Sequence, residues 1–248
     1  MIGLIAAMPE ESRALLRQLL IWEASRLGPF PAFRFRLGEQ DCLLVESGIG
    51  LERARETTLA LLAEGPEKLL SFGVAGAARV GLAIGDVVAI GHTCRLEDGI
   101  AGPLLPLAAL TGAARRAAEQ VLLSRGARLF DGVALTTRGE QVLREETIGL
   151  ENPVLEMETA GIASAAAQAG VPLLALRGIS DNPQEPLPLD PGTVLDEEYR
   201  LKIGKLIGIL LRRPYLLPQL GRFRRNTTLA AENTALVVIA VIGAMASG

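Results

Sequence analysis

The stretch MIGLIAAMPEE, residues 1–11, joins a short apolar run to a proline and two adjacent acids. An apolar run of this length is typical of a strand that is buried on both faces of a sheet. No basic segment precedes it, so we interpret it as a first strand and not as a secretory leader. The run stops at Pro9, and a helical pattern begins at residue 10. The stretch therefore predicts a strand that leads directly into a helix.

The same order of elements recurs along the chain. Apolar runs bounded by glycines lie at 2–7, 42–46, 69–74, 86–91 and 171–176, and helical patterns lie at 10–20, 51–64, 108–125 and 159–169. Strands that alternate with helices predict an α/β fold with a largely parallel sheet. The stretch LGPFPAFRFRLGEQDCLLVESG (27–48) differs, because its period-two pattern and short GEQD turn favour a hairpin. We therefore expect a mixed central sheet flanked by helices.

The chain shows no internal repeat, and we predict one α/β domain over residues 1–195 with a helical tail, 196–248, packed on it. Between them, DNPQEPLPLDPG (181–192) is a proline-rich loop of the kind that can fold over a site. The end of the tail, TALVVIAVIGAMASG (234–248), carries no charge. It is shorter than the roughly 20 residues that a membrane-spanning helix needs, so we expect no span.

Composition excludes several classes of function. The 248 residues carry a net charge of −3 and a pI near 5.4, which argues against an electrostatic nucleic-acid binder. Cys42 and Cys94 form no paired motif, which suits a reducing cytoplasm and predicts neither a disulfide framework nor a metal site. His92, the single histidine, reads as the end of a strand followed by a loop.

Two glycine turns follow predicted strands. VESGIGLERA (45–54) is similar to a dinucleotide fingerprint, but Arg53 stands where the third glycine belongs and no acid follows at the right distance. SFGVAGAARVGLAIGDVV (71–88) is the second turn, and the chain has no phosphate-binding GxxxxGK[ST] motif. Gly48 and the stretch from Gly73 to Gly76 can still line a pocket, because ligands bind beyond the carboxyl ends of parallel strands.

Acids stand at three element ends. Glu10 and Glu11 follow the first strand, Glu156 and Glu158 precede a helix, and Asp181 follows an apolar run. Singly, each reads as a solvated acid favoured by a helix dipole. Together at one edge of the sheet, they suit a reaction with a cationic transition state, or a general acid and a general base.

The motifs, taken in order, resemble those of the nucleoside phosphorylase and nucleosidase family. They are IGLIAAMPEE, ESGIG, GVAGAA…VGLAIGDVV, LEMETAGIASAA and LLALRGISD, and they cover about residues 1–185. The family includes methylthioadenosine/S-adenosylhomocysteine nucleosidase, futalosine hydrolase and purine nucleoside phosphorylase. The resemblance implies a nucleoside phosphorylase-like fold, a cytoplasmic homodimer without a cofactor, and cleavage of a purine ribosyl C–N bond through an oxocarbenium-like transition state.

The resemblance also implies roles for individual residues. Glu158 would hold the ribose 2′-hydroxyl and stabilise the developing positive charge, and Met157 would pack against the sugar. Asp181 would donate a proton, or a strong hydrogen bond, to N7 of the departing purine, while Ser180 would help to fix its loop. Glu11 matches the acid that activates water in the hydrolytic members of the family.

Other positions in the motifs are expected to contact substrate. Glu156 either contacts the substrate or is a structural acid at the helix start. The stretch TTRGEQVL (136–143) implies purine contacts by Val142 and Leu143, and the glycine turn implies contacts by Gly76 and Val74. The chain also departs from the family pattern. Val74 stands where hydrolytic members have a serine, and Asn182 follows Asp181 where some phosphorylases have a histidine.

Three functions remain open at this stage. The first is hydrolysis of an adenine nucleoside with a bulky apolar 5′ substituent, favoured because Glu11 suits water. The second is a phosphorylase with phosphate as co-substrate, for which Arg53, Arg55 and Arg138 are candidate ligands. The third is a noncatalytic nucleoside-binding protein, which would not need Glu11, Glu158 and Asp181 together.

The tail bears on the substrate. LRRPYLLPQLGRFRRNTTLAAENTAL (211–236) resembles the hopanoid-associated branch of the family, which implies adenosylhopane as substrate. Its apolar end is expected either to pack against the domain or to lie on lipid. Since arginines alternate with leucine, tyrosine and phenylalanine, we predict peripheral contact with the inner face of the membrane through about residues 209–246.

Overall fold

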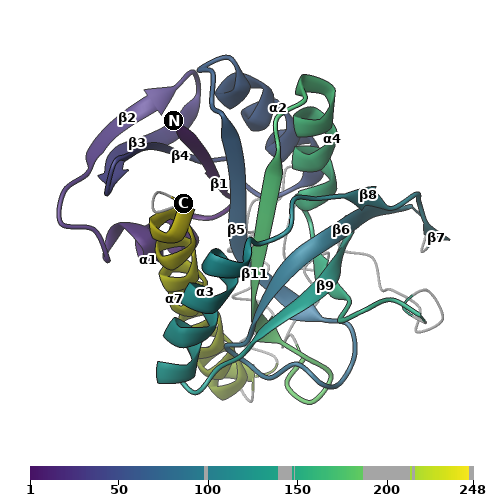
Figure 1. Ribbon diagram of the computed structural model, residues 1–248. Helices are drawn as coiled ribbons and strands as arrows, with labels where there is room; N and C mark the ends of the chain where they lie inside the picture. The colour runs from purple at the N-terminus through teal and green to yellow at the C-terminus, as the bar shows by residue number, and fades with distance from the viewer. Residues whose placement is uncertain (98–99, 139–146, 148, 187–212, 214–215, 246–248) are drawn as a thin grey trace.

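A computed structural model describes residues 1–97, 100–138, 147, 149–186, 213 and 216–245 (Figure 1). The helices are α1 (Pro9–Leu16), α2 (Leu51–Leu62), α3 (Gly112–Ser124), α4 (Thr159–Ala169) and α7 (Leu216–Met245). The first strands are β1 (Ile2–Ala6), β2 (Glu23–Leu27), β3 (Phe30–Leu37), β4 (Gln40–Glu46), β5 (Lys68–Ala77) and β6 (Val87–Glu97). The others are β7 (Ile100–Ala101), β8 (Leu105–Pro106), β9 (Leu129–Thr136), β10 (Val154–Glu156) and β11 (Leu173–Asp181).

The strands form a mixed sheet in the order β10-β9-β6-β11-β5-β1-β4-β3-β2. β1 lies between β4 and β5 and is parallel to both, and β11 is parallel to β5 but antiparallel to β6. β10 pairs with β9 and also with β5, which closes β5, β11, β6, β9 and β10 into a ring. The predicted mixed α/β sheet is confirmed, and so is the hairpin, formed by β3 and β4.

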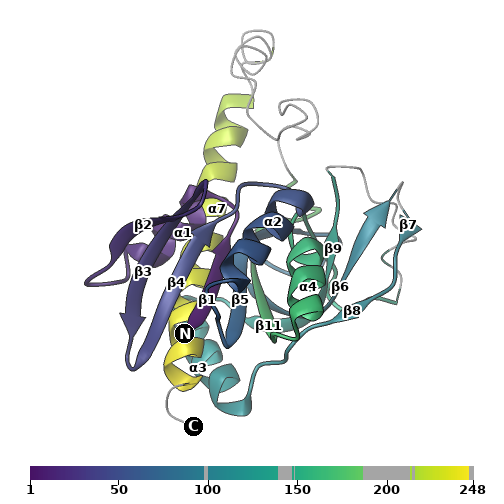
Figure 2. The ribbon, with the colours of Figure 1, turned by 90° about the horizontal axis from the view of Figure 1, so that it is seen from above.

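Helices cover both faces of the sheet (Figure 2). α2 and α4 pack together over one face, where they bury a cluster that includes Ile5, Leu61 and Ile162. α1, α3 and α7 cover the other face, and their cluster includes Leu15, Leu122 and Val238. Because apolar side chains of β1, β4 and β5 enter both clusters, these strands read as continuous apolar runs in the sequence.

Several strands differ from the sequence-based expectation, since β2, β7, β8 and β10 lie outside the predicted runs, and β6 and β9 differ for reasons that the structure shows. The apolar run 86–91 was expected to end near His92, but β6 continues to Glu97 through an irregular register between Ile90 and His92. β9 was not predicted at all, because Gly132 interrupts its apolar pattern. That glycine is required by packing, since a Cβ there would lie 2.6 Å from the backbone oxygen of Asn152.

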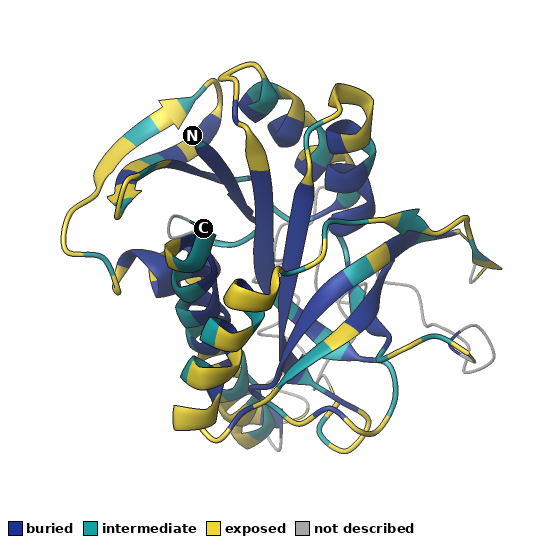
Figure 3. Ribbon diagram, in the orientation of Figure 1, coloured by how far each residue is buried: buried dark blue, intermediate teal, exposed yellow. Residues whose placement is uncertain are grey.

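The tail forms the long helix α7, and its second half is part of the core (Figure 3). Asn233 donates to the carbonyl oxygen of Gly85 at 2.8 Å and accepts from Arg125 at 3.0 Å, so polar contacts also fix the helix. The proposed boundary between residues 195 and 196 lies outside the described residues. The packing of α7 supports a tail that completes the domain.

The tail helix is longer than the apolar segment 234–248 on which the expectation of no membrane span was based. α7 has 30 residues and, within the described chain, is the one helix long and apolar enough to cross a membrane by length and composition. However, half of its most apolar window is buried in the protein. That burial favours packing of residues 230–242 against the domain over contact of these residues with lipid. Peripheral membrane contact stays a prediction, now centred on the more exposed first half of the helix.

Gly178 allows α7 to approach β11 closely. A Cβ at this position would lie 2.5 Å from the carbonyl oxygen of Ala230 and would also collide with the hydroxyl of Thr234. We therefore expect Gly178→Ala to lower the free energy of unfolding by about 1–3 kcal/mol, because overpacking forces backbone shifts. Urea denaturation measures this change through the transition midpoint.

Gly91→Ala is the matched control for Gly178→Ala, since Gly91 also lies in a strand but has open space around its Cβ position. We expect this control to change the free energy of unfolding by no more than about 0.5 kcal/mol. Equal midpoints for the two variants would contradict the tight contact between α7 and β11.

Candidate active site

Glu11 lies in the first turn of α1, directly beyond the carboxyl end of β1. Its Oε2 accepts the backbone N–H groups of Ala7 and Met8, each at 2.9 Å, and its Oε1 accepts the N–H of Val74 at 3.0 Å. The residue is 2% exposed. Burial raises the pKa of Glu11, although these N–H donors and the nearby Arg177 oppose the shift. The carboxylate is therefore held rigidly and is a stronger base than a solvated glutamate.

Two glycines of β5 make room for the acids. A Cβ at Gly73 would lie 2.5 Å from Oε1 of Glu11, and a Cβ at Gly76 would lie 2.5 Å from Oδ2 of Asp181. Any side chain at either position would displace a carboxylate. The glycines of the second turn, 71–88, thus allow close approach of acidic side chains to the strand.

Glu158 lies between β10 and α4, at the position that caps the helix. Its Oε1 accepts the N–H of Gly50 at 2.9 Å, which ties it to the start of α2. Burial raises the pKa of Glu158 to about 8, and the negative charges of Glu156 and Glu11 add to this effect. The Gly50 N–H and Arg177 act in the opposite direction. Glu11 and Glu158 therefore form an interacting pair of buried acids.

Asp181 is the last residue of β11, where it pairs with Gly76 of β5. Ser180 donates its hydroxyl to Oδ1 of Asp181 at 2.7 Å and is itself buried. Burial raises the pKa of Asp181, although the hydrogen bond from Ser180 opposes the shift. Asp181 is thus easier to keep protonated near neutral pH than a solvated aspartate.

A small cavity separates Glu11 from Glu158. Its lining includes Ser47, Ser71, Val74 and Arg177, and the centre of a water molecule has about 10 Å³ in which to move. That space corresponds to about one water molecule. Motif reasoning did not single out Ser47, Ser71 or Arg177, because each stands alone within an apolar strand or beside a glycine turn.

The other residues that were expected to contact substrate lie in different surroundings. Met157 is partly buried beside Glu158, while Val142 and Leu143 lie outside the described residues. Glu156 does not line the cavity, because both of its oxygens accept hydrogen bonds from protein groups. These hydrogen bonds favour the structural alternative, and the role of Glu156 stays a prediction.

The candidate phosphate ligands are also absent from the lining of this cavity. Arg53 donates to the carbonyl oxygen of Ser47 at 3.3 Å, and Arg55 donates to Gln168 at the surface. Arg138 is exposed, and Arg13 lies 3.9 Å from Glu10 in an exposed ion pair. Arg177 is the one cation in the described lining of the cavity.

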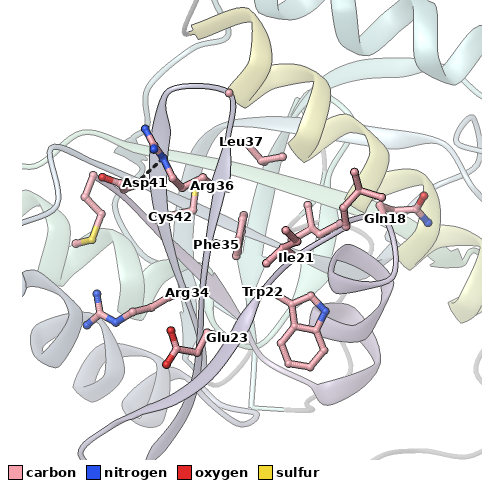
Figure 4. Close-up of a pocket in the computed structure, with 14 residues that line it drawn as sticks. Gln18, Ile21, Trp22, Glu23, Arg34, Phe35, Arg36, Leu37, Asp41 and Cys42 are labelled. Carbon is pink, nitrogen blue, oxygen red and sulfur yellow. Dashed lines mark ion pairs between the residues drawn. The ribbon is translucent and has the colours of Figure 1, made fainter.

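A larger groove of about 870 Å³ lies at the opposite end of the sheet (Figure 4). It is lined by Trp22 and Phe35, and by charged groups such as Arg36, which pairs with Asp41 at 3.0 Å. Cys42, at the start of β4, also lines it. Sheets of this kind bind ligands at the carboxyl ends of their strands, so the acids mark the better candidate site.

The sequence matches the Phosphorylase superfamily over residues 1–204. The chain belongs to this superfamily. Its relatives include a 5′-methylthioadenosine/S-adenosylhomocysteine nucleosidase of Shewanella halifaxensis, 28% identical over 82% of this chain and 93% of that protein. A nucleosidase of the same name from Listeria monocytogenes is 30% identical over 73% of this chain and 85% of the relative.

Solved structures of the superfamily share the fold. The nucleosidase of Colwellia psychrerythraea in complex with adenine has a TM-score of 0.72 and 19% identity, with 98% of this chain and 94% of that chain covered. A futalosine hydrolase mutant of Helicobacter pylori has a TM-score of 0.69 and 20% identity, with 97% of each chain covered. The superfamily and the fold expected from the motifs are therefore confirmed.

Proposed function

We propose that this protein is a nucleosidase that hydrolyses the N-ribosidic bond of an adenine nucleoside and releases adenine. The nucleosidase names of its relatives support the reaction class. The observation that carries the proposal is the water-sized cavity between two buried carboxylates, close to a third acid at the end of β11.

Glu11 is the general base in this proposal. Water in the cavity gives a proton to the free lone pair of Oε1 as its oxygen attacks C1′ of the ribose. Because burial raises the pKa of Glu11, its carboxylate takes up that proton more readily than a solvated glutamate. The three backbone N–H groups hold the carboxylate in position before substrate arrives.

Asp181 and Glu158 act on the other parts of the substrate. As the bond between C1′ and N9 breaks, Asp181 gives its proton to N7 of the purine, so that adenine leaves as a neutral molecule. Glu158 acts in its ionised form, whose share grows as the pH rises towards its pKa of about 8. The carboxylate accepts a hydrogen bond from the 2′-hydroxyl, and its negative charge stabilises the cationic sugar in the transition state. Met157 packs against the sugar, and Val74 and Gly76 of β5 border the site.

The size and charge of the cavity support water as the nucleophile. A phosphate ion has five heavy atoms and needs several cationic or N–H donors. The cavity holds about one water molecule, and the N–H of Val74 is already bonded to Glu11. No metal or organic cofactor has a role in this chemistry.

The names of the relatives and the tail of this chain both bear on the 5′ substituent. The relatives are named for methylthioadenosine and S-adenosylhomocysteine, which both carry a thioether at the 5′ position. The tail supports a bulkier apolar group, with adenosylhopane as the specific proposal, because basic and apolar residues alternate at the start of α7. A homodimer and contact with a membrane surface stay predictions from the sequence.

Adenine release in the absence of phosphate tests the proposed function. We expect the purified protein to release adenine from methylthioadenosine, S-adenosylhomocysteine or a 5′-alkyl adenosine, at a rate that added phosphate does not change. Mass spectrometry of the sugar product is expected to find the 5-substituted ribose with a free hydroxyl at C1, and not its 1-phosphate. Phosphate-dependent release would identify a phosphorylase, and nucleoside binding without adenine release would identify a binding protein.

A further inference from the structure

Glu156 is a buried acid that accepts five hydrogen bonds. Oε2 accepts the backbone N–H groups of Glu158 at 3.0 Å and Thr159 at 2.7 Å, and also the hydroxyl of Thr159 at 2.7 Å. Arg177 donates to the same oxygen at 3.3 Å, and Thr136 donates its hydroxyl to Oε1. The side chain of Glu156 is 1% exposed. Glu156 therefore serves protein groups alone, although it lies two residues from Glu158.

Arg177 extends this network from Glu156 to the cavity. Its guanidinium also donates to the hydroxyls of Ser71 at 2.9 Å and Thr159 at 2.7 Å. Arg177 and Ser71 both line the cavity between Glu11 and Glu158. Breaking a buried ion pair leaves an uncompensated charge, so Arg177 depends on Glu156 to stay in this place.

We infer that Glu156 is a positioning residue, which holds the Glu158 backbone and the Arg177 guanidinium in place beneath the cavity. Its hydrogen bonds to the N–H groups of Glu158 and Thr159 set the point where α4 begins, and so the direction of the Glu158 side chain. The inference rests on the proposed function for its effect on catalysis, but the geometry is a property of the free protein.

The negative charge of Glu156 also affects the pKa of Glu158, which gives a second way to detect its role. The charged groups that face Glu158 are Glu156 on β10, Glu11 on α1 and Arg177 on β11. From α2, the nearby charged group is Arg53, which donates a hydrogen bond to the carbonyl oxygen of Ser47. Glu156→Gln removes one negative charge and leaves Arg177 with fewer anionic partners. Both changes favour the ionised form of Glu158, so the pKa of Glu158 falls in this variant.

Carbon-13 NMR of glutamate carboxyls in the free protein measures this ionisation without any substrate. The Glu158 signal is assigned by its loss in Glu158→Gln. We expect Glu156→Gln to lower the titration midpoint of Glu158 by at least about one pH unit. In adenine release, we expect the acid limb of kcat/KM to move to lower pH, and kcat to fall by about 10²-fold with a smaller change in KM.

Asp86→Asn is the matched control. Asp86 is also a buried acid, and it accepts the backbone N–H groups of Ala83 and Arg128 at 2.9 Å each. It forms an ion pair with Arg128 as well, but it does not line the cavity. We expect it to lower stability while the Glu158 midpoint and the acid limb stay at their wild-type values. A folded Glu156→Gln protein with the wild-type midpoint and wild-type kcat would overturn the inference.

A second variant keeps the test decisive if Glu156→Gln does not fold. Thr136→Val preserves shape and charge but removes the hydroxyl that bonds to Oε1 of Glu156 and to the N–H of Ala160. We expect about a tenfold lower kcat with a wild-type midpoint for Glu158, and a wild-type kcat would overturn the inference. If the wild-type protein releases no adenine, the proposed function fails. The inference is then still decided by NMR of the free protein, either by the Glu158 titration midpoint in Glu156→Gln or by a changed carbon-13 chemical shift of Glu158 in Thr136→Val.

Discussion

Asp181→Asn is expected to lower kcat by about 10² to 10⁴-fold, the usual contribution of a general acid. An amide has nearly the same shape as the carboxylic acid, and Ser180 can still donate to its oxygen. It cannot transfer a proton to N7, so the purine would have to leave as an anion. Because the pKa of Asp181 is raised, the wild-type rate is expected to fall when the pH rises through that value.

Three measurements separate loss of proton transfer from loss of structure. Circular dichroism and the melting temperature of Asp181→Asn are expected to match the wild type. Asp131→Asn is the control, since Asp131 is an exposed acid of β9 that pairs with Arg115. A substrate with a better leaving group than adenine is expected to recover much of the lost rate. Near wild-type turnover of adenine substrates by Asp181→Asn would show that this aspartate is not the acid.

Glu158→Gln is expected to lower kcat by about 10² to 10³-fold with little change in KM. The amide oxygen can still accept the N–H of Gly50 and the 2′-hydroxyl in the ground state. It lacks the negative charge that stabilises the oxocarbenium-like sugar, and interactions made only in the transition state appear in kcat. Steady-state kinetics with methylthioadenosine give both constants.

A 2′-deoxy substrate provides the control for this prediction. Without the 2′-hydroxyl, part of the difference between Glu158→Gln and wild type is expected to disappear, because one partner of the interaction is gone. A variant with raised KM and unchanged kcat would instead assign Glu158 to uniform substrate binding.

The acids at element ends were accessible from the sequence because each follows or precedes a strongly patterned segment. Glu11 lies in the first turn of the helix that follows the apolar strand β1, and Asp181 ends the largely apolar, buried strand β11. Since parallel strands share one edge, their order along the chain was enough to predict that the acids would lie at the same edge.

The residues that contact those acids could not be predicted from the sequence in the same way. Arg177 contacts Glu156 and Ser71, which are 21 and 106 residues away along the chain. No local pattern marks a hydroxyl or a guanidinium that becomes buried only when distant strands come together. The role of Glu156 was ambiguous for the same reason, since its two possible roles differ only in what surrounds the carboxylate.

The position of α7 has a consequence for synthesis of the chain. Phe72 of β5 and Leu176 of β11 belong to the same apolar cluster as Val238, which lies far later in the sequence. While the ribosome is still producing the segment before α7, this face of the sheet is covered by α1 and α3 alone. That face exposes apolar side chains that favour aggregation or chaperone binding. The active-site strands therefore acquire their final support only when α7 emerges.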